Sequence, residues 1–201
     1  MQDIQPEEDR VFPGTGTLLW LAILTLAAFA GLLSLVPPLP AAFTAYLFLT
    51  MALITLIDLR HFIIPDVLSL PAIAVGLLAN IVLFPEGDRF ASLAHGLAGA
   101  LAGGGAFYLL RAVYFRLRGI EGLGLGDVKL AAVAGAWLGP AALPSACLLA
   151  TLSAITGVVL HGALRGRKGM DARQRIPFGS FIAPAILIFW IGQILQMPPL
   201  W

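Results

Sequence analysis

Seven apolar runs, separated by short polar segments, follow one another along the chain. They lie at about residues 17–36, 41–57, 67–84, 91–110, 128–138, 141–163 and 178–196. Most come near the ~20 residues that a helix needs to cross a bilayer, and none alternates polar with apolar residues as the strands of a membrane barrel do. The pattern predicts an all-α, polytopic integral membrane protein with about seven transmembrane helices. The 128–138 run is short, so its helix is expected to extend beyond the run, to tilt, or to start partway into the membrane.

The amino-acid composition agrees with this pattern. The 201 residues are 59% hydrophobic and 11% charged, and the mean hydropathy is +0.93, whereas a soluble domain has about 25% charged residues. The composition therefore excludes an ordinary soluble domain and makes the lipid bilayer a partner. The chain lacks the aromatic residues interleaved with basic ones that single-stranded nucleic acid would stack on, so no nucleic-acid partner is expected.

The basic residues predict how the helices are oriented. With seven crossings, all of the 12 Lys and Arg residues except Arg89 fall on one side of the membrane. Loops rich in Lys and Arg face the cytoplasm, so the N-terminus is expected inside and the C-terminus outside. The most basic stretch, 164–175, is then a cytoplasmic loop. The residues on the basic side are Arg10, Arg60, Arg111, Arg116, Arg118, Lys129, Arg165, Arg167, Lys168, Arg173 and Arg175.

The chain is expected to hold one membrane domain behind an N-terminal anchor. Residues 1–16 are polar and net acidic, without the basic start of a secretory signal, and the run that follows is too long for a cleaved signal. They predict a cytoplasmic tail, followed by an anchor helix and turn at 17–40 and the main domain at 41–196. Cys147 is the single cysteine, which excludes an intrachain disulfide and a cysteine-based zinc cluster. In the fourth run, GALAGGGAF (99–107) favours close helix packing.

Four acidic residues lie at the predicted cytoplasmic ends of the spans: Asp58, Asp66, Glu121 and Asp127. Asp58 ends the second run, where the helix dipole disfavours a carboxylate and no capping role explains it. The structural alternative to a functional role is a salt bridge to Arg60 or Lys129. Asp66 follows Pro65 at an expected N-cap position.

Asp127 closes the glycine-rich stretch GLGLGDVKLAAV (122–133). It can be interpreted as an N-cap, but Gly122, Gly124 and Gly126 also allow unusual backbone angles and close approach to another segment. Their spacing does not match a phosphate-binding loop. A flexible glycine turn that carries a carboxylate on the same face as Asp58 suggests a pair of aspartates, with the glycines as a hinge.

Two carboxylates held close share one proton, because both cannot ionise cheaply in a poorly solvated site. The ionised one can activate a water molecule while the protonated one polarises a peptide carbonyl, which is aspartyl proteolysis without a metal or cofactor. Other constellations are weaker. His61, His95 and His161 fall on different elements, and no serine lies in a GxSxG elbow.

These motifs resemble those of the type IV prepilin peptidases. DLRHFIIPD (58–66) is similar to the family's first signature, with one further residue before the proline. GLGLGDVKLAAVAGAWLG (122–139) resembles its Gly-x-Gly-Asp signature. IPFGSFIAPA (176–185) resembles its Pro-Phe-Gly segment, with Ser180 where a proline is usual. The three occur in the family's order, and the resemblance covers about residues 41–196.

The resemblance implies an aspartic endopeptidase of the bacterial inner membrane, with its active site facing the cytoplasm. Such an enzyme cleaves the short basic leader from prepilins or pseudopilins after a glycine, and it serves pilus or type II secretion machinery indirectly. Asp58 and Asp127 carry over as the catalytic residues. The expected site-supporting residues are Asp66, Gly124, Gly126, Lys129, Pro177 and Gly179, and Glu121 is the expected contact for the leader.

The sequence departs from the family's pattern in one respect. Many family members carry an N-terminal cytoplasmic domain with paired cysteines that is linked to methylation, and this sequence cannot supply those cysteines, so a peptidase-only form is expected.

A membrane transporter or a secretion-assembly module would use the boundary aspartates as ion pairs or proton relays. The spans are nearly free of polar groups, which disfavours transport. An intramembrane protease of signal-peptide remnants would share the aspartate chemistry and differ in substrate.

Overall fold

The computed structural model describes residues 11–83, 89–165 and 177–196. These residues form helices and no strand, so the predicted all-α fold is confirmed for them. The described ranges leave out most of the tail, most of the basic loop at 164–175, and the side chain of His161. The helices are α1 (Thr15–Leu32), α2 (Pro38–His61), α3 (Asp66–Leu83), α4 (Arg89–Arg118), α5 (Leu125–Arg165) and α6 (Gly179–Leu195).

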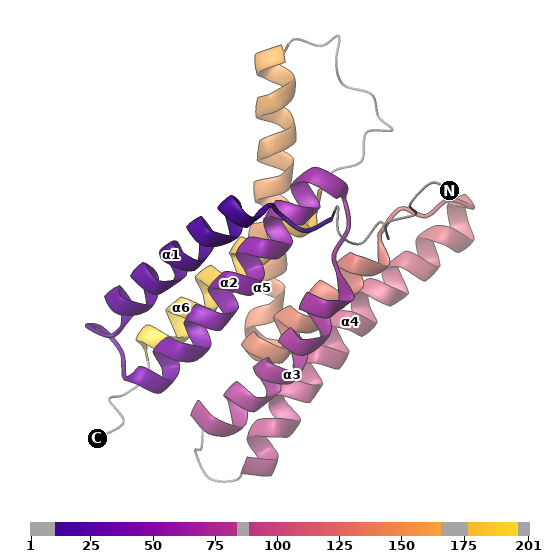
Figure 1. Cartoon of the computed structure of the whole chain (residues 1–201). Coiled ribbons are helices and arrows are strands. Elements are labelled where there is room, and N and C mark those ends of the chain that lie inside the picture. Colours follow the sequence, from indigo (N-terminus) through magenta and orange to yellow (C-terminus); the bar gives the residue numbers. More distant parts are fainter. Residues whose placement is uncertain (1–10, 84–88, 166–176, 197–201) are drawn as a thin grey trace, which may run out of the picture.

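The seven apolar runs correspond to six described helices, because α5 contains two of the runs. Five helices, α1 to α5, are long and apolar enough to cross a membrane, and α6 is shorter, with 17 residues. As expected for the short 128–138 run, its helix extends beyond the run: it begins at Leu125 and continues past a non-helical residue, Gly139, into the next run. In Figure 1 the later part of α5 (orange) rises steeply away from the other helices. The number of crossings and their orientation stay predictions.

The break in α5 has a local cause in Gly139 and Pro140. Gly139 has φ 72° and ψ 174°, a conformation that favours glycine because a Cβ would be strained there. Pro140 lacks the N–H that the carbonyl of Ala136 would accept in a continuous helix. The side-chain amide of Asn80 in α3 supplies the missing donor, with its Nδ2 2.8 Å from that carbonyl oxygen.

The first part of α5 forms the centre of the core. It is almost entirely buried from Leu130 onward and packs against α3, α4 and α6. The ring of Trp137 meets that of Trp190 edge-on at 4.8 Å, and its Nε1 donates to the carbonyl of Ala72 at 2.8 Å. Buried indoles pack best when their N–H finds an acceptor, so this cluster fixes α5 relative to α3 and α6.

Glycines bring the backbones of α4 and α5 into direct contact. A Cβ on Gly135 would overlap the carbonyl oxygen of Gly99, and a Cβ on Gly103 would overlap that of Ala131. Small residues permit such close approach between membrane helices. Gly105, in contrast, faces open space. The close packing predicted from GALAGGGAF is therefore confirmed for Gly99 and Gly103.

Helix α1 is the least buried of the candidate spans. It contacts α2 and no other described helix, and Leu21 is its one buried residue. Figure 1 shows it alongside α2, at one side of the molecule. Its exposed side chains are large and apolar, including Leu19, Trp20 and Leu26, as expected of a helix surrounded by lipid. The division into a tail, an anchor at 17–40 and a domain at 41–196 stays a prediction.

Candidate active site

Asp58 lies near the end of α2 and is only 4% exposed. Its Oδ2 accepts a hydrogen bond from the backbone N–H of Ser180, 2.7 Å away in the first turn of α6. The start of a helix offers free N–H groups and the positive end of the helix dipole. Helix α6 therefore offsets the unfavourable position that Asp58 occupies in its own helix.

Asp127 is the third residue of α5, not the residue before it. Its Oδ2 accepts a hydrogen bond from the backbone N–H of Gly124 at 3.3 Å. This is the backward half of a capping box, in which the third helical residue satisfies the N–H of the capping residue. The interpretation of Asp127 as an N-cap is wrong by three positions, because the helix begins earlier, at Leu125. The side chain still serves the helix start while remaining partly exposed.

Ile64 lies against the helix starts that are next to the two aspartates. Its side chain, 7% exposed, lies in the loop between α2 and α3. A Cβ on Gly126 would come 3.0 Å from Ile64 Cβ, and a Cβ on Gly179 would come 2.8 Å from Ile64 Cδ1 and 2.9 Å from Asp58 Oδ2. The starts of α5 and α6 and the α2–α3 loop thus meet around one side chain, and we call this meeting point the Ile64 junction.

The Ile64 junction brings the predicted catalytic residues into one region. Asp58 borders it on the α6 side, and Asp127 follows directly after Gly126 on the α5 side. Each carboxylate is held by a backbone N–H at a helix start, that of Ser180 for Asp58 and that of Gly124 for Asp127. Two carboxylates that come together in such a region could hold one proton between them and perform acid–base chemistry, and their pairing stays a prediction.

Lys129 and Asp66, both predicted to support the site, form an ion pair with each other. The pair links α5 to the first residue of α3, two residues after Ile64 in the chain. The alternative salt bridge between Asp58 and Lys129 is therefore wrong, because Lys129 is directed to Asp66. The N-cap expected at Asp66 is also wrong, because the carbonyl of Pro65 accepts the first bonds of α3 and Asp66 already lies inside the helix.

The glycine-rich loop is attached to α4. Arg111 forms an ion pair with Glu121, and its Nε donates to the carbonyl of Leu123 at 3.1 Å. A Cβ on Gly122 would overlap the ring of Tyr114. These contacts give Gly122 a packing role. The hinge function stays a prediction, and so does the leader contact of Glu121, whose side chain is 67% exposed.

The first turn of α6 contributes one residue, Ser180, that the sequence analysis did not assign to the site. Besides donating to Asp58, Ser180 donates its hydroxyl hydrogen to the carbonyl of Pro177 at 2.6 Å. Pro177 and Gly179 were predicted to support the site, and they flank this turn. The signal available in the sequence was the position of Ser180 directly after Gly179, at the start of an apolar run that predicts a helix.

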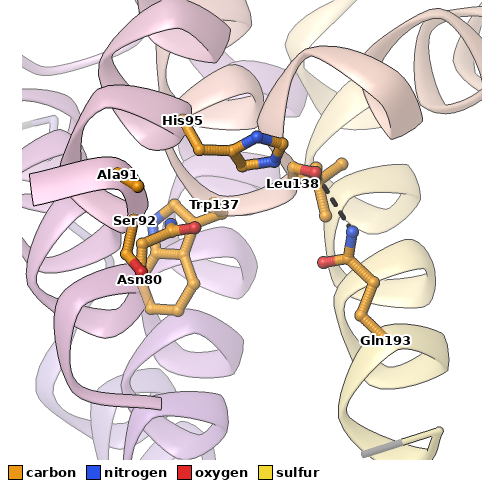
Figure 2. Close-up of a pocket in the computed structure, with 7 residues that line it drawn as sticks. All are labelled: Asn80, Ala91, Ser92, His95, Trp137, Leu138 and Gln193. Atoms are coloured by element: carbon orange, nitrogen blue, oxygen red, sulfur yellow. Dashed lines mark hydrogen bonds between the residues drawn. The ribbon is translucent and has the colours of Figure 1, made fainter. Parts of the chain in front are cut away.

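A separate pocket of about 290 Å³ lies at the break in α5. Its lining comes from the late part of α3, the start of α4, the residues of α5 before the break and the late part of α6, whereas Asp58 bonds to the start of α6 and Asp127 lies in the first turn of α5. Figure 2 shows the Gln193 amide reaching the carbonyl of Leu138, and His95 lies beside them. Among the described residues that line this pocket there is no carboxylate. No group of three or more His, Cys, Asp or Glu that could hold a metal occurs in the part of the chain that the structure describes.

Comparison with known proteins gives consistent matches. The family model of the type IV leader peptidase family matches residues 45–160, which include Asp58, Asp66 and Asp127 but not the segment before α6. Proteins named prepilin leader peptidase/N-methyltransferase are 39% identical over 155 residues in Burkholderia pseudomallei, 40% over 157 in Pseudomonas aeruginosa and 38% over 164 in Pectobacterium carotovorum. No solved structure matches significantly.

The matches cover a larger share of this chain than of the relatives. The matches cover 77%, 76% and 80% of this chain but only 48%, 51% and 55% of the respective relatives. The chain thus spans about half the length of the curated relatives it matches. The family model, in contrast, covers more than half of this chain and both aspartate signatures. The chain belongs to the type IV leader peptidase family.

Proposed function

We propose that this chain is an aspartic endopeptidase that removes the short basic leader from type IV prepilins or pseudopilins. The reaction takes place at the cytoplasmic face of a bacterial inner membrane. The related proteins are named for leader peptidase and N-methyltransferase activities, and the proposal concerns the peptidase alone. The observation that carries it is the Ile64 junction, where Asp58 and Asp127 border one small region from two different helices.

The proposed chemistry uses both carboxylates. The ionised one takes a proton from a water molecule, whose oxygen bonds to the peptide carbonyl carbon, while the protonated one gives its proton to the carbonyl oxygen. The C–N bond of the tetrahedral intermediate then breaks, and the amine receives the proton taken from water. One hydroxyl group returns its proton to the second carboxylate, which restores the pair. The backbone donors of Ser180 and Gly124 orient the two carboxylates.

The broken helix α5 is the feature that would favour a transporter, because transporters bind substrates at interrupted helices. Two carbonyls next to the break, those of Ala136 and Leu138, each accept a hydrogen bond from a side-chain amide, of Asn80 and Gln193 respectively. These carbonyls therefore already have partners within the protein. This observation favours a structural role for the break and supports the peptidase over the transporter.

The test is leader removal by purified protein in detergent or vesicles, measured by mass spectrometry of a prepilin substrate. Asp58→Asn and Asp127→Asn each remove one proton-transfer group, so each is expected to lower the cleavage rate by about 10²-fold or more. Asp88→Asn removes the same kind of charge from a predicted outer loop and should cleave at the wild-type rate.

Two results would contradict the peptidase. One is wild-type cleavage by both aspartate variants, each shown to be folded by its elution and thermal unfolding. The other is a folded wild-type chain that leaves every prepilin and pseudopilin intact, which would favour a non-catalytic assembly module.

A further inference from the structure

The Ile64 junction leaves little space beside Asp58. A single carbon added at Gly179 would lie 2.9 Å from Asp58 Oδ2 and 2.8 Å from Ile64 Cδ1, and both distances are shorter than an ordinary contact between such atoms. On the α5 side, a carbon added at Gly126 would be 3.0 to 3.2 Å from three atoms of the same isoleucine. Ile64 therefore fills the region that borders the carboxylate.

Several contacts hold Ile64 in this position. As a β-branched residue it has a restricted side-chain rotation, and it is buried to 7% exposure. The loop that carries it begins at Phe62, whose left-handed backbone (φ 56°) ends α2 with a hydrogen bond to the carbonyl of Asp58. The loop ends at the ion pair between Asp66 and Lys129. The short loop that carries Ile64 is thus fixed at both of its ends.

A peptide cleaved by the aspartates must come close to this side chain. Its carbonyl oxygen and the attacking water have to lie within about 2.6–3.2 Å of the carboxylates. The carbonyl carbon belongs to the residue before the scissile bond, and the Cβ of that residue is only two bonds away. The side chain of the next residue is one bond farther. The residue before the scissile bond is therefore the one whose side chain meets the crowded junction.

We propose that Ile64 is a specificity-determining residue, which admits glycine before the scissile bond and rejects residues with a side chain. The inference rests on the proposed peptidase function and assigns its substrate selection to one residue. Shortening Ile64 opens space for an added methyl group beside Asp58. The aspartates and their backbone donors stay in place, so cleavage of the glycine substrate continues.

The test compares two prepilins that differ in one residue, glycine or alanine, before the scissile bond. In Ile64→Ala, the ratio of kcat/KM for the alanine substrate to that for the glycine substrate is expected to rise about tenfold or more, the usual effect of a methylene-sized change in an apolar pocket. Ile63→Ala is the matched control, because the neighbouring isoleucine is 51% exposed in the same loop, and its ratio should equal that of the wild type.

An unchanged ratio in folded Ile64→Ala, or an equal rise in Ile63→Ala, overturns the specificity proposal while leaving the peptidase intact. If Ile64→Ala fails to fold, Ile64→Val serves instead, with an expected rise of about threefold and the same overturning result. Failure of the proposed function looks different: the wild type then cleaves neither substrate, or Asp58→Asn cleaves both at the wild-type rate, and the specificity proposal falls with it.

Discussion

A backbone N–H from a distant part of the chain stabilises Asp58 in its buried position. An unpaired buried carboxylate is costly, and the end of its own helix offers no compensation. The N–H of Ser180 supplies the hydrogen bond from the first turn of α6. Gly179, the residue before it, allows α6 to begin so close to Asp58, since a side chain there would occupy the space of the carboxylate.

This contact leads to a prediction for Gly179→Ala. The added Cβ would press on Asp58 Oδ2 and on Ile64 Cδ1, so we expect the rate of leader cleavage to fall about tenfold or more, the order of loss expected when catalytic groups are displaced. The measurement is kcat/KM with a glycine substrate, at equal amounts of folded protein.

Gly192→Ala is the control on the same helix. Gly192 has open space where a Cβ would be added, so this variant should keep full activity and gain up to about 1 kcal/mol of stability from helix propensity. Adding Ile64→Ala to Gly179→Ala removes one of the two obstructing groups and should recover part of the activity. Full activity in Gly179→Ala alone would contradict the crowding at Asp58.

At the scale of the helices, α4 and α5 depend on small residues where their backbones touch. Gly135→Ala places a Cβ against the carbonyl oxygen of Gly99, and the backbones cannot separate without losing the contacts around them. Overpacking of this kind costs about 1–3 kcal/mol or more, so thermal unfolding in detergent should occur at a clearly lower temperature. Gly105→Ala, on α4 but facing open space, should be neutral or slightly stabilising. Equal melting temperatures for the two variants would contradict the direct contact between the backbones of α4 and α5.

The break in α5 gives a second prediction at this scale. Asn80→Leu removes the donor to the carbonyl of Ala136, which Pro140 leaves without its helical partner. An unsatisfied buried acceptor costs about 1–3 kcal/mol, so the variant should unfold at a lower temperature. Thr156→Val removes an exposed hydroxyl that bonds only within its own helix and should have little effect. A melting temperature unchanged by Asn80→Leu would show that the break needs no such donor.

For the whole molecule, the distribution of basic residues predicts an odd number of crossings. In a Cys147→Ala background, single cysteines at Asp88 and Trp201 should react with a membrane-impermeant maleimide from the outside. Cysteines at Gln2 and Glu121 should react only after the membrane is opened, because positive loops stay in the cytoplasm. Labelling of the Gln2 and Trp201 positions from the same side would mean an even number of crossings.

The sequence alone predicted most of the helices to within a few residues, because an apolar run of membrane length has few alternatives to a helix in lipid. Helix starts were less predictable. Asp66 was expected as an N-cap and Asp127 could be interpreted as one, yet each lies inside its helix, since the chain becomes helical one to three residues earlier. Propensity and capping signals are local and weak, and neighbouring helices shift the boundary.

What the sequence by itself determined is the membrane character, the helices and the two aspartate motifs, all of which depend on residues close together in the chain. Only the tertiary structure decided what surrounds the aspartates. Asp58 accepts a hydrogen bond from a residue 122 positions away, and Lys129 forms an ion pair with Asp66. Ile64 lies against the glycines at the starts of α5 and α6. These contacts depend on how the helices pack, and several pairings of the same charged residues satisfy the sequence pattern equally well.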